Sequence, residues 1–406
     1  MTIALFKAST LDPVLPSARR SAEVVDAAMR LDVIHDEVEF LALESCWDEL
    51  LQQCATRSPF LSWDWVKIWW EEHRDKFKLA IGVVRTSGNK TLAIAPLVIG
   101  REVVGSRKQL LHLTFIGGIG EIASQGMDFM VPAGHEENFT PLLCGIFAKL
   151  LRRVDILRLT MIPEDSPNLP HIMRALKQVT SGVSQLNRQP SRLLTLPASW
   201  QEIEQSHGGN WRSNMRRKQK KMDGEHQGRV VIGGRDVPFD VAFSALLELH
   251  GQRWSVEESL FLHERTKRFH RRLYEQCAAD GRMMIVLLEL DGKFQAATYC
   301  LIHDNKAWFY QAGWNQDYCG ISIGKLALAW TVRHAIELGL REFDFLPVDY
   351  SYKQEWADGV RHVVDIEAFN PRSATASIFR FLRFMKRHTS ARKPAAETCC
   401  TTTCSE

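Results

Sequence analysis

Apolar residues follow two different periods along the chain, and this mixture predicts a protein built from both strands and helices. In the first half, alternating apolar residues predict strands, and apolar residues spaced by three or four predict helices. A Ser87-Gly88-Asn89 turn predicts a hairpin between two of these strands. Strands are expected at 38–43, 79–86, 91–100, 110–118 and 156–162, and helices at 45–51, 63–70, 141–151 and 169–179.

The second half has the same mixture and adds a strongly basic helix. A meander of three strands is expected at 283–313, with tight turns at Asp291-Gly292 and Asp304-Asn305. Further strands are expected at 193–197, 230–234 and 342–346, and helices at 210–222, 239–254, 264–279 and 325–338.

The order helix, strand, glycine-containing hairpin, strand occurs at 63–99 and again at 272–302. The repetition predicts two related domains side by side. The alternative is a chance similarity in the order of elements, of the kind that any α+β protein shows. We therefore expect an α+β (α/β mixed) fold of two tandem domains, each with a mixed central sheet flanked by helices. The segments are a flexible arm at 1–33, domains at 34–192 and 193–372, and an amphipathic helix with a disordered tail at 373–406.

Composition excludes several classes of protein. The 406 residues are enough for two domains, and a net charge of +3 is too small to indicate nucleic-acid binding by the whole surface. Nine cysteines without C-x-x-C spacing indicate a cytoplasmic protein with free thiols. No stretch approaches the roughly 18 apolar residues of a membrane span, and the N-terminus lacks the apolar core of a signal peptide. The histidines have no metal-ligand spacing, so we expect no metal.

A glycine-containing loop between an aromatic strand and an amphipathic helix has the clearest chemical use. Such a loop directs backbone N–H groups and the positive helix end at a phosphate. Backbone N–H groups near Gln311 and Gly313 would polarise a carbonyl in acyl transfer, and Tyr350 or Tyr352 would protonate a leaving thiolate. The alternative is a turn that only enters the helix. The residues suited to a pyrophosphate are Gly320, Ile321, Ser322, Gly324 and Lys325.

Three motifs, LHGQRW, GISIGKLAL and FDFLPVDYSYKQEW, resemble those of the GNAT acyltransferase superfamily. They are more similar still to its CelD/BcsL-type branch, whose members carry tandem GNAT-like domains similar to the Fem aminoacyltransferases. The resemblance runs from Val38 to Phe369. It implies acetyl-coenzyme A, or another acyl-coenzyme A, on the loop between strand and helix. The family usually has a proline before the second loop glycine and a glycine after the FDFL strand, where this chain has Ile323 and Val348.

Asp344 lies between two phenylalanines in the strand that closes this unit. Burial would raise its pKa and make it a candidate general base; the alternative is a pairing with Lys353, Arg341 or a backbone donor. Lys353 and Trp356 either line the pocket for the acyl acceptor or fix the strand end to the core.

Two helices of the second half carry further candidates for substrate contacts. Arg212, Arg216 and Lys220 form one helical stripe that would hold a phosphate-bearing acceptor; a solvated helix face is the alternative. In LHGQRW, His250 is either a catalytic base or a structural histidine, and Arg253 is a candidate substrate contact.

In the first half, GGIGEIASQGMDF is the counterpart of the coenzyme loop. No long helix opens directly from it, so we expect this domain to have lost donor binding and to serve as scaffold or acceptor wall. Ser124 to Asp128 would then face a cleft between the domains. The basic amphipathic helix at 377–388 either packs on its own domain or makes peripheral contact with a membrane.

The expected function is acyl-coenzyme-A-dependent N- or O-acyl transfer, directly to the acceptor. As the resemblance implies, the acceptor is an amino sugar, a polysaccharide precursor or another small envelope-related metabolite. One alternative is an aminoacyl-tRNA-dependent transferase of the Fem type, against which the absence of a long heptad arm argues. The other is a non-catalytic accessory protein of polysaccharide biosynthesis. No DNA partner is expected.

Overall fold

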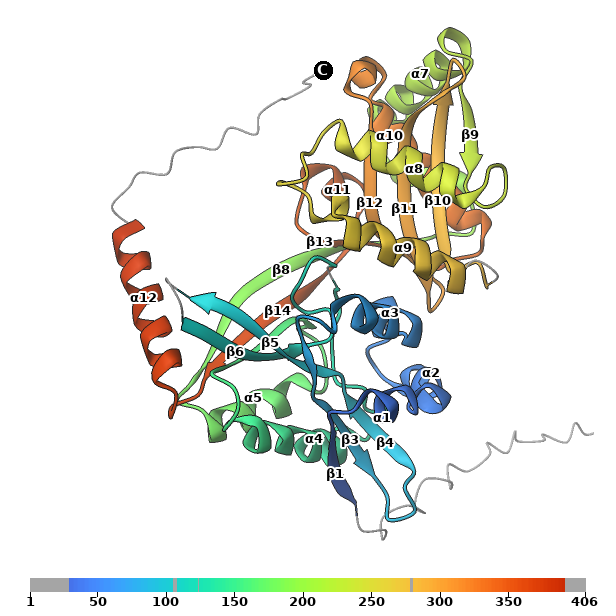
Figure 1. Ribbon diagram of the computed structural model, residues 1–406. Helices are drawn as coiled ribbons and strands as arrows, with labels where there is room; N and C mark the ends of the chain where they lie inside the picture. The colour runs from blue at the N-terminus through green and yellow to red at the C-terminus, as the bar shows by residue number, and fades with distance from the viewer. Residues whose placement is uncertain (1–28, 105–107, 123, 278–279, 391–406) are drawn as a thin grey trace, which may run out of the picture.

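The computed structural model describes residues 29–104, 108–122, 124–277 and 280–390. The remainder of the predicted arm and tail, 1–28 and 391–406, lies outside the described residues. Within the described ranges, the chain forms a mixed sheet of 11 strands, a separate sheet of 3 strands, and helices that flank them (Figure 1). The predicted mixed fold class is confirmed.

The first half starts with a strand and three helices, continues with a series of antiparallel strands, and ends with two helices that alternate with long strands. In chain order these elements are β1 (Arg30–Ile34), α1 (Glu37–Leu41), α2 (Glu44–Gln53), α3 (Trp63–His73), β2 (Lys78–Leu79), β3 (Ile81–Arg85), β4 (Thr91–Ala95), β5 (Leu97–Val104), β6 (Lys108–Phe115), α4 (Glu136–Leu150), β7 (Ile156–Pro163), α5 (Leu169–Val179) and β8 (Val183–Thr195).

The second half has the predicted meander at its centre, with turns whose residues Asp291, Gly292, Asp304 and Asn305 all have positive φ. In chain order its elements are α6 (Trp200–Ser206), α7 (Gly209–Glu225), β9 (Arg229–Ile232), α8 (Phe239–Gly251), α9 (Glu264–Cys277), β10 (Met283–Leu290), β11 (Lys293–His303), β12 (Lys306–Trp314), the 3-10 helix η4 (Gln316–Ile321), α10 (Ile323–Glu337), β13 (Glu342–Pro347), α11 (Ser351–Trp356), β14 (Gly359–Phe369) and α12 (Ala374–Ser390).

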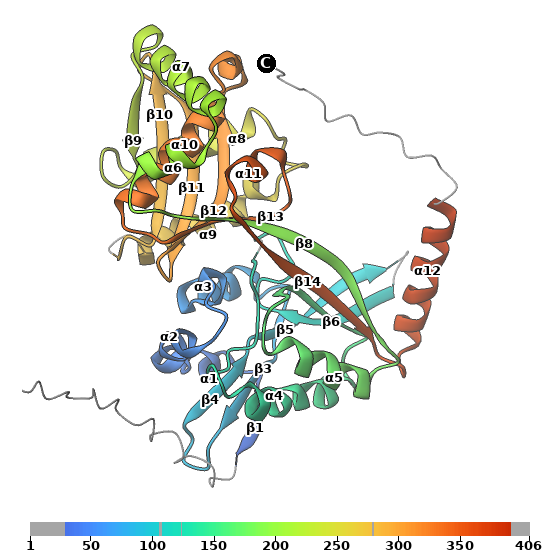
Figure 2. The same cartoon turned by 180° about the vertical axis from the view of Figure 1, so that it is seen from behind.

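The two halves exchange their last strands. The order of the large sheet is β2-β5-β6-β7-β14-β8-β13-β12-β11-β10-β9, so β14 pairs with β7 and β8 pairs with β13. These two strands also pair with each other and cross between the halves (Figures 1 and 2). Either side of this crossing, β6–β7 and β12–β13 are parallel pairs. The arrangement matches the predicted duplication, but the expected boundary at 193 falls inside β8.

The helices α3 and α9, which are equivalent in the two halves, pack against each other. The rings of Trp65 and Phe269 meet edge to face with centroids 4.7 Å apart. At the margin of this contact, Arg268 and Glu72 form an ion pair of 3.1 Å. The halves are therefore joined both through the sheet and through a helix pair.

Two expectations about the first half are wrong. The segment 38–43 is not a strand, because Asp36 caps a helix by accepting hydrogen bonds from the backbone N–H groups of Val38 and Glu39. Its apolar residues also fit a helix, since Phe40 and Leu43 are three apart and both buried. Ser124 and Asp128 do not face a cleft, because both side chains are buried.

Candidate functional site

Strands β12 and β13 pair for a short distance and then separate. They are parallel partners from Lys306–Glu342 to Trp308–Asp344, and no pairing continues beyond that point in the described residues. Each strand is irregular there: the register of β12 against β11 shifts at Tyr310, and that of β13 against β8 shifts between Asp344 and Pro347. The divergence leaves an open sheet position beside the start of α10.

The bulge in β13 is held by a buried carboxylate. Leu346 has a φ of 59°, and its backbone N–H donates to Asp344 Oδ1 over 2.7 Å. Ser191 Oγ on β8 donates to the same oxygen, also over 2.7 Å. Burial raises the pKa of Asp344, while the two hydrogen bonds act in the opposite direction. Asp344 therefore stabilises the shape of the strand end. This agrees with the alternative that it pairs with a backbone donor.

Lys353 reaches the same bulge from α11. Its Nζ donates to the carbonyl oxygens of Leu346 and Pro347, over 3.0 and 3.2 Å. The side chain is only 4% exposed, and burial lowers its pKa to about 8. Trp356 is buried among other aromatic side chains one turn further on. Lys353 thus holds the strand end, and Trp356 packs α11 against Trp200 and Trp211, so both have the structural role that was one of the two expected for them.

The N-terminus of α10 is open to an anion. Ser322 is its N-cap residue, in a left-handed conformation and without a side-chain cap, and the first turn contains no acidic residue. Lys325 in that turn forms an ion pair of 2.8 Å with Glu355 of α11. Lys218 of α7 is buried nearby. Its pKa is lowered, mainly by burial and to a smaller extent by the positive charge of Lys325. Because Lys218 has no ion-pair partner among the described residues, an anion here would relieve its desolvation.

An arginine between two tryptophans lies beside this helix end. The guanidinium carbon of Arg253 is 4.4 Å from the ring centre of Trp314 and 5.1 Å from that of Trp254. Trp314 in turn packs over Gly324, where an added Cβ would lie 3.1 Å from the indole ring. Gly324 thus makes room for Trp314. Within the part of the chain that the structure describes, the N–H groups of the Arg253 side chain form no hydrogen bond or ion pair.

Residues 209–354 match the model of the acetyltransferase (GNAT) domain. The second half carries a GNAT-like domain. No curated protein matches the chain in sequence. Among solved structures, FemX is 10% identical, with coverage of 83% of this chain and 97% of that chain and a TM-score of 0.56. This likeness extends over both halves and concerns the fold.

Two further structures are similar at lower TM-scores. The C-terminal domain of a putative lysylphosphatidylglycerol synthetase from Agrobacterium fabrum is 10% identical, with 86% of this chain and 96% of that chain covered and a TM-score of 0.48. A tandem GNAT protein from the clavulanic acid biosynthesis pathway is 13% identical, with 85% and 100% covered and a TM-score of 0.45.

In the GNAT-like domain, His250 has a structural position. It is buried, its Nδ1 lies 2.9 Å from the carbonyl oxygen of Ala312, and its Nε2 lies 2.8 Å from Ser259 Oγ. A carbonyl can only accept, so Nδ1 carries the proton and Nε2 accepts from the serine. Burial lowers the pKa of His250 and keeps the ring neutral. Both nitrogens are occupied, so this histidine anchors α8 to β12 and has no free base.

Two residues of β12 that were expected to hold the donor have close contacts within the protein. Gln311 Oε1 accepts from the backbone N–H of Ala312 over 3.0 Å. At Gly313 an added Cβ would lie 2.4 Å from the backbone nitrogen of His250, so glycine allows α8 to cross the strand closely. Gly320 and Ile321 belong to η4, and Gly320 has open space around it.

Tyr352 lies on α11 near Arg253, whose charge acts on it. Burial raises the pKa of Tyr352 to about 12, so its hydroxyl stays protonated at neutral pH. The ring stacks on that of Tyr350 with centroids 5.9 Å apart. Within the described chain, the Tyr352 hydroxyl has no hydrogen-bond partner and can act as a donor.

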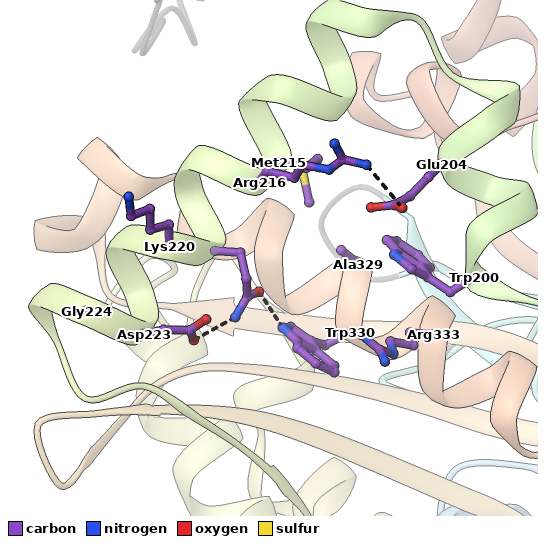
Figure 3. A pocket seen from close by; sticks show the side chains of 11 residues that line it. Trp200, Glu204, Met215, Arg216, Lys220, Asp223, Gly224, Ala329, Trp330 and Arg333 are labelled. Carbon is purple, nitrogen blue, oxygen red and sulfur yellow. Dashed lines mark hydrogen bonds and ion pairs between the residues drawn. The ribbon is translucent and has the colours of Figure 1, made fainter.

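The predicted basic stripe divides between two roles, and Figure 3 shows the cavity that Arg216 and Lys220 line. Arg212 donates to the carbonyl oxygens of Glu204 and His207 and so completes the end of α6. Arg216 and Lys220 instead line a cavity of about 510 Å³ between α6, α7 and α10. Its walls also contain the tryptophans Trp200 and Trp330.

Sequence reasoning missed Lys218 and the stacking of Arg253, because both depend on contacts between distant elements. The motif LHGQRW did single out Arg253, although not its tryptophan partners. In the described residues, no group of three His, Cys, Asp or Glu side chains is placed to hold a metal. No helix among those residues is long and apolar enough to span a membrane.

Proposed function

We propose that the protein is an acyltransferase that uses an acyl-coenzyme A, with its donor site where β12 and β13 separate beside the N-terminus of α10. The observation that carries the proposal is the open, uncapped start of α10 next to Lys218 and Arg253. A helix N-terminus and two cations with no ion-pair partner in the described residues suit a pyrophosphate.

The residues present fit such a donor. Backbone N–H groups at the start of α10, with Lys218 and Arg253, would hold the phosphates, and the separated strand ends would admit the pantetheine arm between them. The donor supplies an activated thioester carbonyl. The acyl group would pass directly to a nucleophilic nitrogen or oxygen of the acceptor, as no covalent enzyme intermediate is needed.

Tyr352 is the proposed proton donor to the leaving thiolate. Its hydroxyl is protonated at neutral pH, has no hydrogen-bond partner among described residues, and belongs to the helix whose Glu355 pairs with Lys325 at the donor loop. Asp344 and His250 are better suited to positioning the strands than to moving a proton, because Asp344 Oδ1 holds the bulge of β13 through two hydrogen bonds and both ring nitrogens of His250 are engaged. We propose an amino sugar or a polysaccharide precursor as acceptor, following the family resemblance.

The donor site is tested by calorimetric titration of the full chain with acetyl-coenzyme A. Arg253→Ala should weaken binding roughly tenfold, because it removes a charge-assisted contact to phosphate. Arg333→Ala is the matched control: Arg333 also stacks on a tryptophan of α10, Trp330, at 4.7 Å, but beyond the helix start. It should leave affinity unchanged.

Absence of binding to the wild-type chain would refute the acyl-coenzyme A proposal. Equal losses in both variants would show that Arg253 does not mark the donor site. Salt-dependent binding of aminoacyl-tRNA, lost on reversing the charges of Arg216 and Arg217, would instead favour a donor of the Fem type.

A further inference from the structure

Helix α12, which ends the described part of the chain, lies at the margin of the molecule beside the ends of β5 and β6 (Figures 1 and 2). It contacts β6 on one side. In neither view does another described element lie on its outer side. The helix contributes no residue to the proposed donor site, so a partner bound here does not depend on acyl-coenzyme A.

The start of α12 is fixed to the first half of the chain. Asn370 Nδ2 donates to the carbonyl oxygen of Val154 over 2.9 Å. Ser373 Oγ donates to Asp155 and accepts from the backbone N–H of Ala376 over 3.0 Å, so it caps the helix. Ala376 itself is buried. The helix therefore leaves the sheet in a defined direction.

The inner side of α12 packs on β14. The ring of Phe379 lies against that of Phe369, with centroids 6.5 Å apart. Arg383 forms an ion pair with Glu367, which is 1% exposed and is also held by Arg158 over 3.1 Å. The helix thus packs on its own domain, which was one of the two roles expected for it.

The outer side of α12 is apolar and exposed. Ile378 is 40% exposed and Phe381 is 61% exposed. They are three residues apart, so they lie on the same side of the helix, away from Phe379. In the sequence, the apolar spacing continues with Leu382 and Met385. Large apolar side chains that a fold leaves together at its surface indicate a contact with a partner.

The charge of α12 has one sign. Its 17 residues include no aspartate or glutamate, whereas four are arginine or lysine: Arg380, Arg383, Lys386 and Arg387. Arg383 is used by the pair with Glu367. Arg380 is exposed and forms no ion pair among the described residues, and its guanidinium carbon lies 5.9 Å from the ring centre of Phe369. Helical spacing places Arg380 between the inner and the outer side.

Apolar side chains flanked by positive charge distinguish between the possible partners. A second copy of the chain would bring two positive helices together, and these repel each other. A nucleic acid would use the charge but would leave Ile378 and Phe381 exposed to water. An anionic lipid bilayer accommodates both features, because apolar side chains enter the boundary of the acyl chains while arginines remain among the headgroups.

We propose that α12 lies on the surface of an anionic lipid bilayer, with Ile378 and Phe381 inserted and Arg380 at the headgroups. The test is co-sedimentation of the full chain with vesicles of phosphatidylcholine and phosphatidylglycerol in equal parts. Vesicles of phosphatidylcholine alone are the control, and the partition coefficient for them should be at least roughly tenfold lower. Added salt should weaken binding to the anionic vesicles.

Variants then assign the binding to α12. Phe381→Asp should lower the partition coefficient roughly tenfold or more, because it removes an inserted ring and adds a negative charge. The matched control is Val241→Asp, which replaces an exposed apolar residue of α8 and should leave the partition coefficient unchanged.

The contribution of charge is tested separately. Arg380→Glu should also lower the partition coefficient roughly tenfold, because it changes two charges near the lipid surface. Arg217→Glu makes the same change on the basic helix α7, where the side chain is also exposed, and should leave the partition coefficient unchanged.

Three outcomes would overturn the proposal. The first is equal sedimentation with anionic and neutral vesicles, or none with either. The second is a loss in Arg217→Glu as large as that in Arg380→Glu, which would assign the binding to general charge. The third is a Phe381→Asp variant that binds like the wild type, since the apolar side would then not be inserted.

The substituted side chains are exposed, so these variants should keep the wild-type melting temperature. They should also keep the wild-type affinity for acetyl-coenzyme A, because α12 has no residue at the donor site. Loss of vesicle binding and loss of acetyl-coenzyme A binding are therefore separate results, and the two proposals fail separately.

Discussion

The two halves share one order of strands but differ at the helix that connects the two parallel strands, α4 between β6 and β7 and α10 between β12 and β13. In the first half, α4 has Glu136 and Glu137 in its first turn, and Glu136 accepts a hydrogen bond from the backbone N–H of Gly134. In the second half, α10 has no acidic residue there and Lys325 instead. The positive end of α4 thus has acidic residues of its own chain beside it, whereas that of α10 has none in its first turn.

The bulges in the equivalent strands extend the comparison. Met161 on β7 has a φ of 58°, and Leu346 on β13 has a φ of 59°. Each backbone N–H is held by an aspartate, Asp365 for Met161 and Asp344 for Leu346. The carbonyls differ, since that of Met161 accepts from the backbone N–H of Met127 in the loop after β6.

That loop is largely buried in the first half, with Met127, Phe129 and Met130 all inside the core. The loop covers the bulge of β7, whereas in the second half the side chain of Lys353 binds the carbonyl groups of the β13 bulge. In the first half the longer loop thus occupies the space beside the bulge, the place where we propose the donor site in the second half. This agrees with the expectation that the first half has lost donor binding, which stays a prediction.

The largest effect should come from removing the aspartate of either bulge. Asp344→Ala and Asp365→Ala should each lower the free energy of unfolding by roughly 4 kcal/mol, because buried donors lose their acceptor. Urea denaturation measures this loss. Only Asp344→Ala should also weaken acetyl-coenzyme A binding. Loss of donor binding in folded Asp365→Ala would break the comparison.

A smaller effect should depend on pH through Lys353. The pKa of this lysine is about 8 in the folded chain and 10.5 for an ordinary lysine, so the unfolded chain binds more protons between these values. The free energy of unfolding should therefore rise as pH increases from 8 to 10.5, by about 3 kcal/mol.

Lys353→Met should remove this rise, as measured by urea denaturation at several pH values. The matched control is Lys325→Met, which replaces a lysine that is 42% exposed and should keep the rise. No equivalent is expected from the first-half bulge, where a backbone N–H holds the carbonyl. An unchanged pH slope in Lys353→Met would contradict the assignment.

The smallest effect should come from the residue that follows the bulge. Val348 is exposed and has a φ of 80°, a conformation that a β-branched residue adopts only with strain. Val348→Gly should raise the free energy of unfolding by about 1 kcal/mol, because the relieved strain exceeds the added entropy of the unfolded chain. Thermal denaturation is the measurement.

Val360→Gly provides the control for this change. Val360 is also exposed but lies in the regular strand β14, so glycine there should destabilise by about 1 kcal/mol. If both substitutions destabilise, the strain at Val348 does not exist. The glycine that the resembling family has at this position is the residue that its backbone conformation favours.

Periodicity sufficed for most elements, since local patterns such as Trp65, Ile68 and Trp69 place one face of a helix in the core. It failed at Val38, where a capping aspartate decided between helix and strand. The entry into a helix at Gly320 to Lys325 could be predicted because its signals are local in sequence.

Long-range pairing could not be predicted. Nothing near Asp344 indicates that Ser191 on β8 will donate to it, and nothing near Gly100 indicates that His112 will pack against it. The strand exchange was missed for the same reason. The sequence predicts β8 as the first strand of the second domain, but β8 pairs with β13 and with β14, which in turn pairs with β7 of the first half. These features depend on which strands become neighbours, a choice that no single segment encodes.

The exchanged strands have a consequence for synthesis of the chain. β7 acquires its neighbour β14 only after about 200 further residues have left the ribosome, a delay that follows from their positions at 156–163 and 359–369. Until then its edge is an unpaired template for other chains, as exposed strand edges are. A chain cut at 192 would keep that exposed edge permanently, and each piece should aggregate unless it is made together with the other.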